Sequence, residues 1–180
     1  MKDNTAKGEN TSKFPVENVS WDDIQPFLKK VNDRPGAGKA FGKAGRFVLP
    51  TEDEWEYACR GGKGNKQAFY WGDVLNGTEA NCLGSRSPYG TTTGEYLQRT
   101  CAVDFTNSGK YELHPWGLCQ MHGNVHEWCE DKYRQSEERR VARGGSWINY
   151  ACRCRAANRY WNATAGRFDY IGFRVAFRLD

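Results

Sequence analysis

The sequence predicts an α+β fold with two short helices, short antiparallel strands and a loop-rich body. Near residues 20 and 51, two helix-capping motifs precede apolar residues at helical spacing. From residue 173 to 179, apolar residues alternate with period two, which is typical of a half-buried strand. A chain of 180 residues is long enough for one domain with its own core. We therefore expect a single domain over residues 14–180.

The N-terminal third gives a tail, a helix and a strand. Residues 1–13 are polar and contain no apolar run, which predicts a disordered tail. Ser20 and Asp23 have the spacing of a capping box, and Ile24 begins an apolar stripe that predicts a helix over residues 20–32. Pro35 and several glycines then predict a loop, and the segment RFVLP that follows is typical of a short strand.

The second helix begins at a stronger signal. Thr51 and Glu54 form a capping-box pair, Trp55 begins the apolar face, and Gly61 and Gly62 allow the positive φ that ends a helix. Residues 63–140 contain few periodic segments and many Gly, Asn, Thr and Ser residues, so we expect loops there. Phe173, Val175, Phe177 and Leu179 supply the alternation of the C-terminal strand.

Composition bears on the class of partner. The net charge is +4, and the basic residues are spread along the chain, so nucleic acid is not an expected partner. The mean hydropathy is −0.83 and no apolar run approaches the roughly 18 residues that span a bilayer, so we expect no membrane insertion. The N-terminal residues do not resemble a signal peptide. The localisation therefore stays open, with display on a phage particle or cell surface through another segment or partner as one expectation.

Six sequence blocks occur in an order that is found in a known family. They are PVENVSWDD, RFVLPTEDEWEYACRGG, YWGD, PWGLCQMHGNVHEWCED, RVARGGSW and IGFRVAFR. From Pro15 to Arg178 the chain resembles the formylglycine-generating-enzyme-like (sulfatase-modifying factor) family. This resemblance implies a C-type-lectin-like fold for residues 14–180.

The resemblance also bears on catalysis. Oxidases of the family hold copper with two cysteines, the first placed three residues after the Ser of the GGS turn and the second five residues further on. In this chain the first position is Asn149, and the nearby thiols, Cys152 and Cys154, have a different spacing. Because soft thiolates suit Cu(I), a copper-dependent formylglycine-generating oxidase acting on peptidyl cysteine remains the alternative. The expected reading is a protein that is not an enzyme.

Residues 143–174 are similar to the variable region of proteins diversified by retroelements, in which a reverse transcriptase alters adenine-containing codons. RGGSW, Cys154, Arg155 and Arg159 match its fixed residues. The residues between them are called the variable positions below. They are Ile148, Asn149, Tyr150, Cys152, Arg153, Tyr160, Trp161, Asn162, Phe168, Asp169 and Tyr170. The resemblance implies a receptor or host-recognition protein whose partner is a protein or other surface ligand of unknown identity.

The composition of these positions agrees with a binding surface. Rigid aromatic side chains offer contact area at low entropic cost, as in paratopes. We therefore predict that five aromatic residues line one concave surface. They are Tyr150, Tyr160, Trp161, Phe168 and Tyr170. The alternative is that they belong to the core.

Metal sites have two readings. Cys119, His122, His126 and Cys129 have residue types that suit zinc. By resemblance to the family, calcium ligands are instead expected in two sets. The first set is the Asn124 side chain, the Val125 carbonyl and Glu127; the second is Asn81 and the Cys82 carbonyl, with acidic help near Glu95. We expect no required cofactor, and calcium in a structural role at most.

Overall fold

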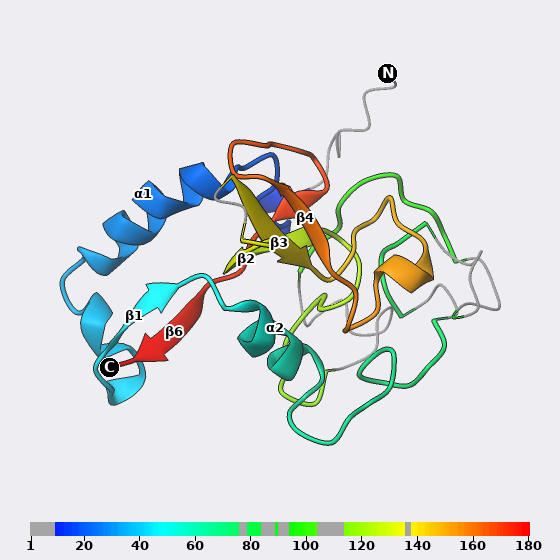
Figure 1. Ribbon diagram of the computed structural model, residues 1–180, viewed down its shortest axis with the longest axis horizontal. Helices are drawn as coiled ribbons and strands as arrows, with labels where there is room; N and C mark the ends of the chain where they lie inside the picture. The colour runs from blue at the N-terminus through cyan, green and yellow to red at the C-terminus, as the bar shows by residue number, and fades with distance from the viewer. Residues whose placement is uncertain (1–9, 76–78, 84–88, 90–93, 104–113, 136–137) are drawn as a thin grey trace.

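The computed structural model describes residues 10–75, 79–83, 89, 94–103, 114–135 and 138–180. The elements, in chain order, are η1 (Thr11–Lys13), α1 (Trp21–Asn32), η2 (Ala37–Gly42), β1 (Gly45–Val48), α2 (Glu52–Cys59), β2 (His126–Lys132), β3 (Arg139–Arg143), η4 (Ala151–Arg153), β4 (Tyr160–Ala163), β5 (Ile171–Gly172) and β6 (Ala176–Leu179) (Figure 1). Within the described residues, neither α-helix combines the length and the apolarity that crossing a bilayer requires.

Both predicted helices are confirmed, together with their caps. The Asp23 backbone N–H donates to Ser20 Oγ at 3.1 Å, and the Asp23 carboxylate accepts from the Ser20 N–H at 2.9 Å. Thr51 and Glu54 form the same reciprocal pair at the start of α2. These bonds satisfy backbone donors that the first helical turn leaves unpaired. Each helix therefore begins where the sequence predicts.

The expected N-terminal tail needs one correction. Residues 1–9 lie outside the described residues, but Thr11–Lys13 form η1, capped by the side chain of Asn10. The Val103 N–H donates to the Lys13 carbonyl at 2.7 Å. The domain therefore begins before the predicted boundary at residue 14.

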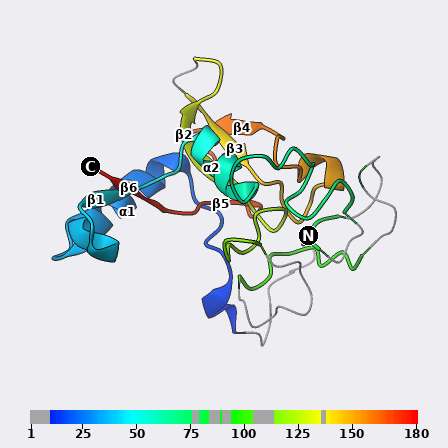
Figure 2. The same ribbon diagram turned by 90° about the horizontal axis from the view of Figure 1, so that it is seen from below.

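The strands form two sheets. β1 and β6 pair in an antiparallel ribbon that lies beside α1 at one end of the molecule (Figures 1 and 2). The larger sheet has the order β4-β3-β2-β5, with antiparallel pairing except between β2 and β5, which are parallel. The predicted antiparallel strands are confirmed, and the pairing of β2 with β5 adds one parallel pair.

β2 lies inside the span that was expected to be loops. Its first four residues, His126–Cys129, are all buried, so the segment lacks the alternation of a half-exposed strand. The C-terminal alternation was also partly misleading, because Val175 and Leu179 are exposed. Phe173 and Phe177 instead pack edge-to-face on Phe27 and Phe47.

The two helices contribute to separate core clusters on the larger sheet. Ile24 and Leu28 of α1 pack with Trp128 and Ala142, whereas Trp55 and Cys59 of α2 pack with Cys129 and Val141. Adjacent strand residues point to opposite faces, so α1 covers one face of the sheet and α2 covers the other. Figure 1 shows β2 and β3 between the two helices.

Candidate functional site

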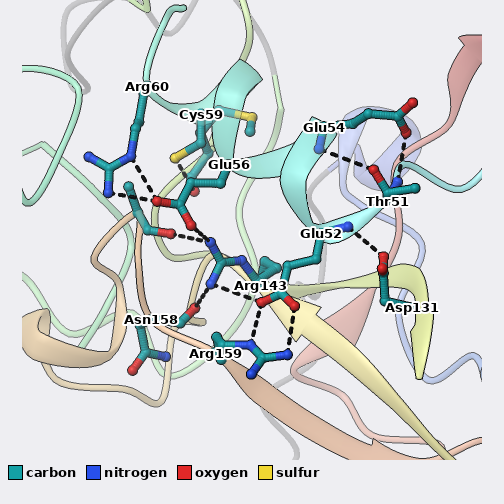
Figure 3. A network of polar contacts seen from close by, with 12 residues as sticks. Thr51, Glu52, Glu54, Glu56, Cys59, Arg60, Asp131, Arg143, Asn158 and Arg159 are labelled. Carbon is teal, nitrogen blue, oxygen red and sulfur yellow. Dashed lines mark hydrogen bonds and ion pairs between the residues drawn. The ribbon is translucent and has the colours of Figure 1, made fainter. Parts of the chain in front are cut away.

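Arg143, the last residue of β3, closes the loop that carries the first variable positions. Its Nη1 donates to the Asn158 carbonyl at 2.8 Å, and its Nη2 donates to the Ala156 carbonyl at 2.7 Å. Nη2 also pairs with Glu56 of α2 (Figure 3). Residue 143 thus holds both ends of the loop 144–157 together and attaches them to α2.

The side chain of Arg143 is fully buried, and its charge is balanced by acidic groups of α2. Glu52 lies 3.4 Å from Nη1, and the same carboxylate binds the exposed Arg159 through two hydrogen bonds of 2.5 and 2.7 Å. The guanidinium also lies over the ring of Trp55, at 5.4 Å from its centre. A planar, permanently charged group suits such a multi-acceptor position.

Two glycines begin this loop because the chain must turn tightly. Gly144 and Gly145 have φ values of 92° and 73°. A Cβ on Gly145 would lie 2.6 Å from the Sγ of Cys154, which is fully buried. The turn and the packing of Cys154 therefore exclude a side chain at residue 145.

Several variable positions surround His126, the first residue of β2. Its ring stacks on Tyr160 with centroids 4.4 Å apart, and its N–H donates to the Tyr170 carbonyl at 2.8 Å. Burial lowers the pKa of His126 to about 4, against hydrogen bonds from the Asn149 side chain and the Arg143 backbone. We call His126, Asn149, Tyr160 and Tyr170 the His126 cluster. Three of its four members are variable positions.

The segment 168–170 completes this region. Phe168 stacks on Tyr170 at 5.1 Å between ring centroids, and both rings pack with Tyr160 on the α1 side of the core. Burial is the main cause that raises the pKa of Tyr170 to about 12. Trp147 Nε1 donates to the Asp169 carbonyl at 3.2 Å, so the turn after Gly145 contacts this segment directly.

The apolar variable positions differ in exposure and do not form one continuous surface. Three of them are exposed: Ile148 (41%), Tyr150 (40%) and Trp161 (36%). Tyr160, Phe168 and Tyr170 are half-buried against the α1 side of the core.

Trp161 needs a correction. It pairs with Val141, whereas Tyr160 pairs with Ala142, so the two side chains leave β4 on opposite faces. Trp161 stacks on Tyr133 at 5.4 Å and lies under Arg139. The predicted single surface therefore excludes Trp161.

The remaining variable positions lie beside these groups. Arg153 is exposed, and its charge further lowers the pKa of His126. Cys152 is half-buried, and its carbonyl accepts from Arg155 Nε at 2.8 Å. Asn162 is half-buried and caps the N–H of Ala163 at 2.8 Å.

The thiol and zinc readings can be compared with this geometry. Contact with Cys82 and burial raise the pKa of Cys154 well above its usual value, which favours a thiol over the nucleophilic thiolate. His122 contacts the Cys154 carbonyl at 2.6 Å and Cys59 Sγ at 3.5 Å, whereas His126 stacks on Tyr160. Among the described residues, no three His, Cys, Asp or Glu side chains form a metal-binding group, so the zinc reading is wrong.

The first calcium set makes several hydrogen bonds within the protein. Both carboxylate oxygens of Glu127 accept from Arg174 at 2.5 Å, and Oε2 also accepts from Trp55 Nε1 at 2.6 Å. Asn124 Oδ1 accepts from Asn81 Nδ2 at 3.1 Å and from the Cys101 N–H at 2.9 Å. Calcium requires several available oxygens, so it would compete with these donors. Calcium at Asn124, Val125 and Glu127 stays a prediction.

The second calcium set differs in one respect. Asn81 Oδ1 is buried and has no hydrogen-bond partner among the described residues. The side-chain nitrogen of Asn81 donates to the Arg99 carbonyl at 2.9 Å. Calcium at Asn81, the Cys82 carbonyl and Glu95 stays a prediction.

Sequence reasoning missed one residue that organises the site. His126 was considered only as a zinc ligand, and not as the residue on which Tyr160 stacks. The alternation that places His126 under Tyr160 becomes visible only with the strand pairing.

Residues 1–179 match the family described as the sulfatase-modifying factor enzyme 1-like domain. The inactive C-alpha-formylglycine-generating enzyme 2 of Bos taurus is 32% identical over 171 residues, which are 91% of this chain and 50% of that protein. The formylglycine-generating enzyme of Mus musculus is 33% identical over 186 residues, with 92% of this chain and 44% of that protein covered. The chain spans about half the length of these relatives.

Solved structures share the fold. Treponema denticola variable protein 1 superposes with a TM-score of 0.70 at 25% identity, covering 96% of this chain and 74% of that chain. CarF superposes with a TM-score of 0.73 at 22% identity, covering 97% and 71%, which shows the fold alone. These matches confirm the α+β, formylglycine-generating-enzyme-like fold that the sequence predicts.

Proposed function

Because the chain belongs to the family of sulfatase-modifying factor enzyme 1-like domains, we propose that it is a non-enzymatic protein that binds a protein or other surface ligand. The binding surface is formed by the variable positions around His126, without Trp161. The proposal is carried by Asn149, which stands where the family resemblance implies the first copper-binding cysteine. Asn149 Oδ1 accepts from Ser146 Oγ at 2.9 Å, and its side chain acts on the pKa of His126 in the direction opposite to burial.

The arrangement of the surface supports binding over catalysis. Two buried residues outside the variable positions support the binding surface. Arg143 closes the loop, and the ring of His126 stacks on Tyr160. Ile148, Tyr150 and Asp169 extend outward as exposed side chains. Exchanging such side chains alters contacts while the buried scaffold stays unchanged. This is the behaviour required of a surface diversified by a retroelement, and the likeness to Treponema denticola variable protein 1 supports it.

The alternative is a copper-dependent oxidase acting on peptidyl cysteine, because several relatives are named formylglycine-generating enzyme. Copper(I) is held by deprotonated thiols. Cys154 is fully buried, and its raised pKa opposes deprotonation. We expect no oxygen consumption when the protein is incubated with copper and a cysteine peptide. Turnover under these conditions would replace the binding proposal.

The binding function is tested with an array of candidate host and cell-surface proteins. A specific hit is then titrated against Tyr150→Ala and Tyr170→Ala. The matched control is Trp116→Ala, since Trp116 is 49% exposed and lies outside the variable positions. Loss of affinity in the two tyrosine variants, with the control unchanged, is the expected result. Equal losses in all three variants would contradict the proposed surface.

A further inference from the structure

A cavity of about 350 Å³ is lined by residues of α1, β1 and the adjoining parts of β2 and β3. It shares no residue with the variable positions. Its apolar wall includes Trp21 and Leu28 of α1 and Phe47 of β1. The volume falls within the range of small-molecule sites, roughly 300–1,000 Å³.

One charged side chain in the wall, Arg140 of β3, is held in place but incompletely paired. Its guanidinium lies 4.2 Å from the centre of the Trp21 ring, and its Nη1 donates to the Glu130 carbonyl at 3.1 Å. Its Nε is buried and has no hydrogen-bond partner among the described residues. Buried donors in folded proteins nearly always have a partner. Arg140 therefore has one donor that the described residues leave unpaired.

The charges around the cavity favour an anion. Glu130 also lines it, but the Glu130 carboxylate pairs with Arg178 at 3.0 Å, which offsets its charge. Arg46, an exposed residue, is a second arginine in the lining. The apolar wall accommodates a hydrocarbon body, while the two arginines supply the positive end.

We propose that this cavity binds a small organic carboxylate with an apolar body. The Nε edge of a guanidinium is a fork that meets both oxygens of a carboxylate. We expect the guanidinium of Arg140 to turn on the Trp21 ring so that this edge meets the acid, while the hydrocarbon packs on Leu28 and Phe47. The inference is independent of the proposed binding function, because it uses a different part of the fold.

The test is a titration of the intact chain with hexanoate, followed by NMR at the indole N–H of Trp21, which donates to the Cys129 carbonyl at 3.1 Å. Hexan-1-ol and hexylamine are the neutral and cationic controls of the same length. We expect saturable shifts with hexanoate, and binding at least about ten-fold weaker with either control, because charge-assisted hydrogen bonds are the strong ones.

The chain offers a matched pair of variants. Arg139 and Arg140 are neighbours on β3, but Arg139 lies over Trp161 on the opposite face of the sheet. Arg140→Gln should weaken hexanoate binding by about ten-fold or more, and Arg139→Gln should leave it unchanged. If Arg140→Gln does not fold, Gln25→Trp narrows the cavity from α1 and should abolish binding with Arg140 intact.

Three results would overturn the proposal. The first is no saturable shift with hexanoate in the unsubstituted chain. The second is equal affinity for hexanoate and hexan-1-ol, which would mean that only the apolar wall contributes. The third is an equal loss in Arg139→Gln and Arg140→Gln, which would mean that charge at a distance, rather than contact, attracts the acid.

Discussion

Replacing Arg143 with lysine isolates the geometry of the loop closure from its charge. The guanidinium donates to two carbonyls, of Asn158 and Ala156, and also pairs with Glu56. A lysine ammonium keeps the charge but is a compact group that lacks the planar fork. We expect it to retain one of these three contacts. Charge-assisted hydrogen bonds contribute about 1.5–3 kcal/mol each, so losing two of them in Arg143→Lys should lower the free energy of unfolding by about 3–6 kcal/mol.

The assay is urea denaturation, combined with hydrogen exchange over residues 144–157. The matched control is Arg159→Lys, because Arg159 is 49% exposed and binds Glu52 at the surface. A surface ion pair contributes about 0–1 kcal/mol, so the control should change little. Faster exchange in the loop should accompany the loss at residue 143. If Arg143→Lys lowers the free energy of unfolding no more than Arg159→Lys does, then Arg143 does not close the loop.

Further predictions concern the turn, the buried ion pair and one histidine. Gly145→Ala should lower the free energy of unfolding by more than about 1 kcal/mol, because φ is 73° and the added Cβ would lie 2.6 Å from Cys154 Sγ. The measurement is thermal unfolding. An unchanged melting temperature would show that the turn tolerates a side chain. Glu127→Gln should lower the free energy of unfolding by about 3–5 kcal/mol, because it leaves the charge of Arg174 without its ion-pair partner. Adding Arg174→Met to the same chain should recover part of this stability. Burial lowers the pKa of His122 from 6.5 to about 3, so the unfolded chain gains a proton first as the pH falls. His122 should therefore lower the free energy of unfolding by up to about 1.4 kcal/mol per pH unit between pH 6.5 and pH 3, in addition to the contribution of buried His126. His122→Gln should remove the His122 part of this slope, and an unchanged slope would contradict the lowered pKa.

The helices were predictable because their signals are local. Ser20 and Asp23, like Thr51 and Glu54, are three residues apart and satisfy each other's backbone donors within one turn. The same holds for Gly61, whose φ of 69° follows the end of α2. No distant residue is needed to interpret these motifs.

β2 and the site depend on contacts that are distant in sequence. Residues 126–129 are buried on both faces, so they show no alternation that would predict a strand. The ion pair of Glu127 is not visible in the sequence around it, because its partner Arg174 lies 47 residues further along the chain. The prediction of one surface is wrong for Trp161, because four residues are too few to show the period of β4. For the other four aromatic residues it stays a prediction.

In the proposed diversified surface, the alternation along β4 places neighbouring variable positions on opposite faces of the sheet. Tyr160 and Asn162 lie on the α1 face of the sheet, and Trp161 lies on the α2 face beside Tyr133. A partner that contacts the His126 cluster does not contact the side chain of residue 161. We therefore expect sequences that differ at Trp161 alone to bind such a partner with equal affinity. In the proposed diversified surface, only every second residue of β4 changes the contacts that one partner makes.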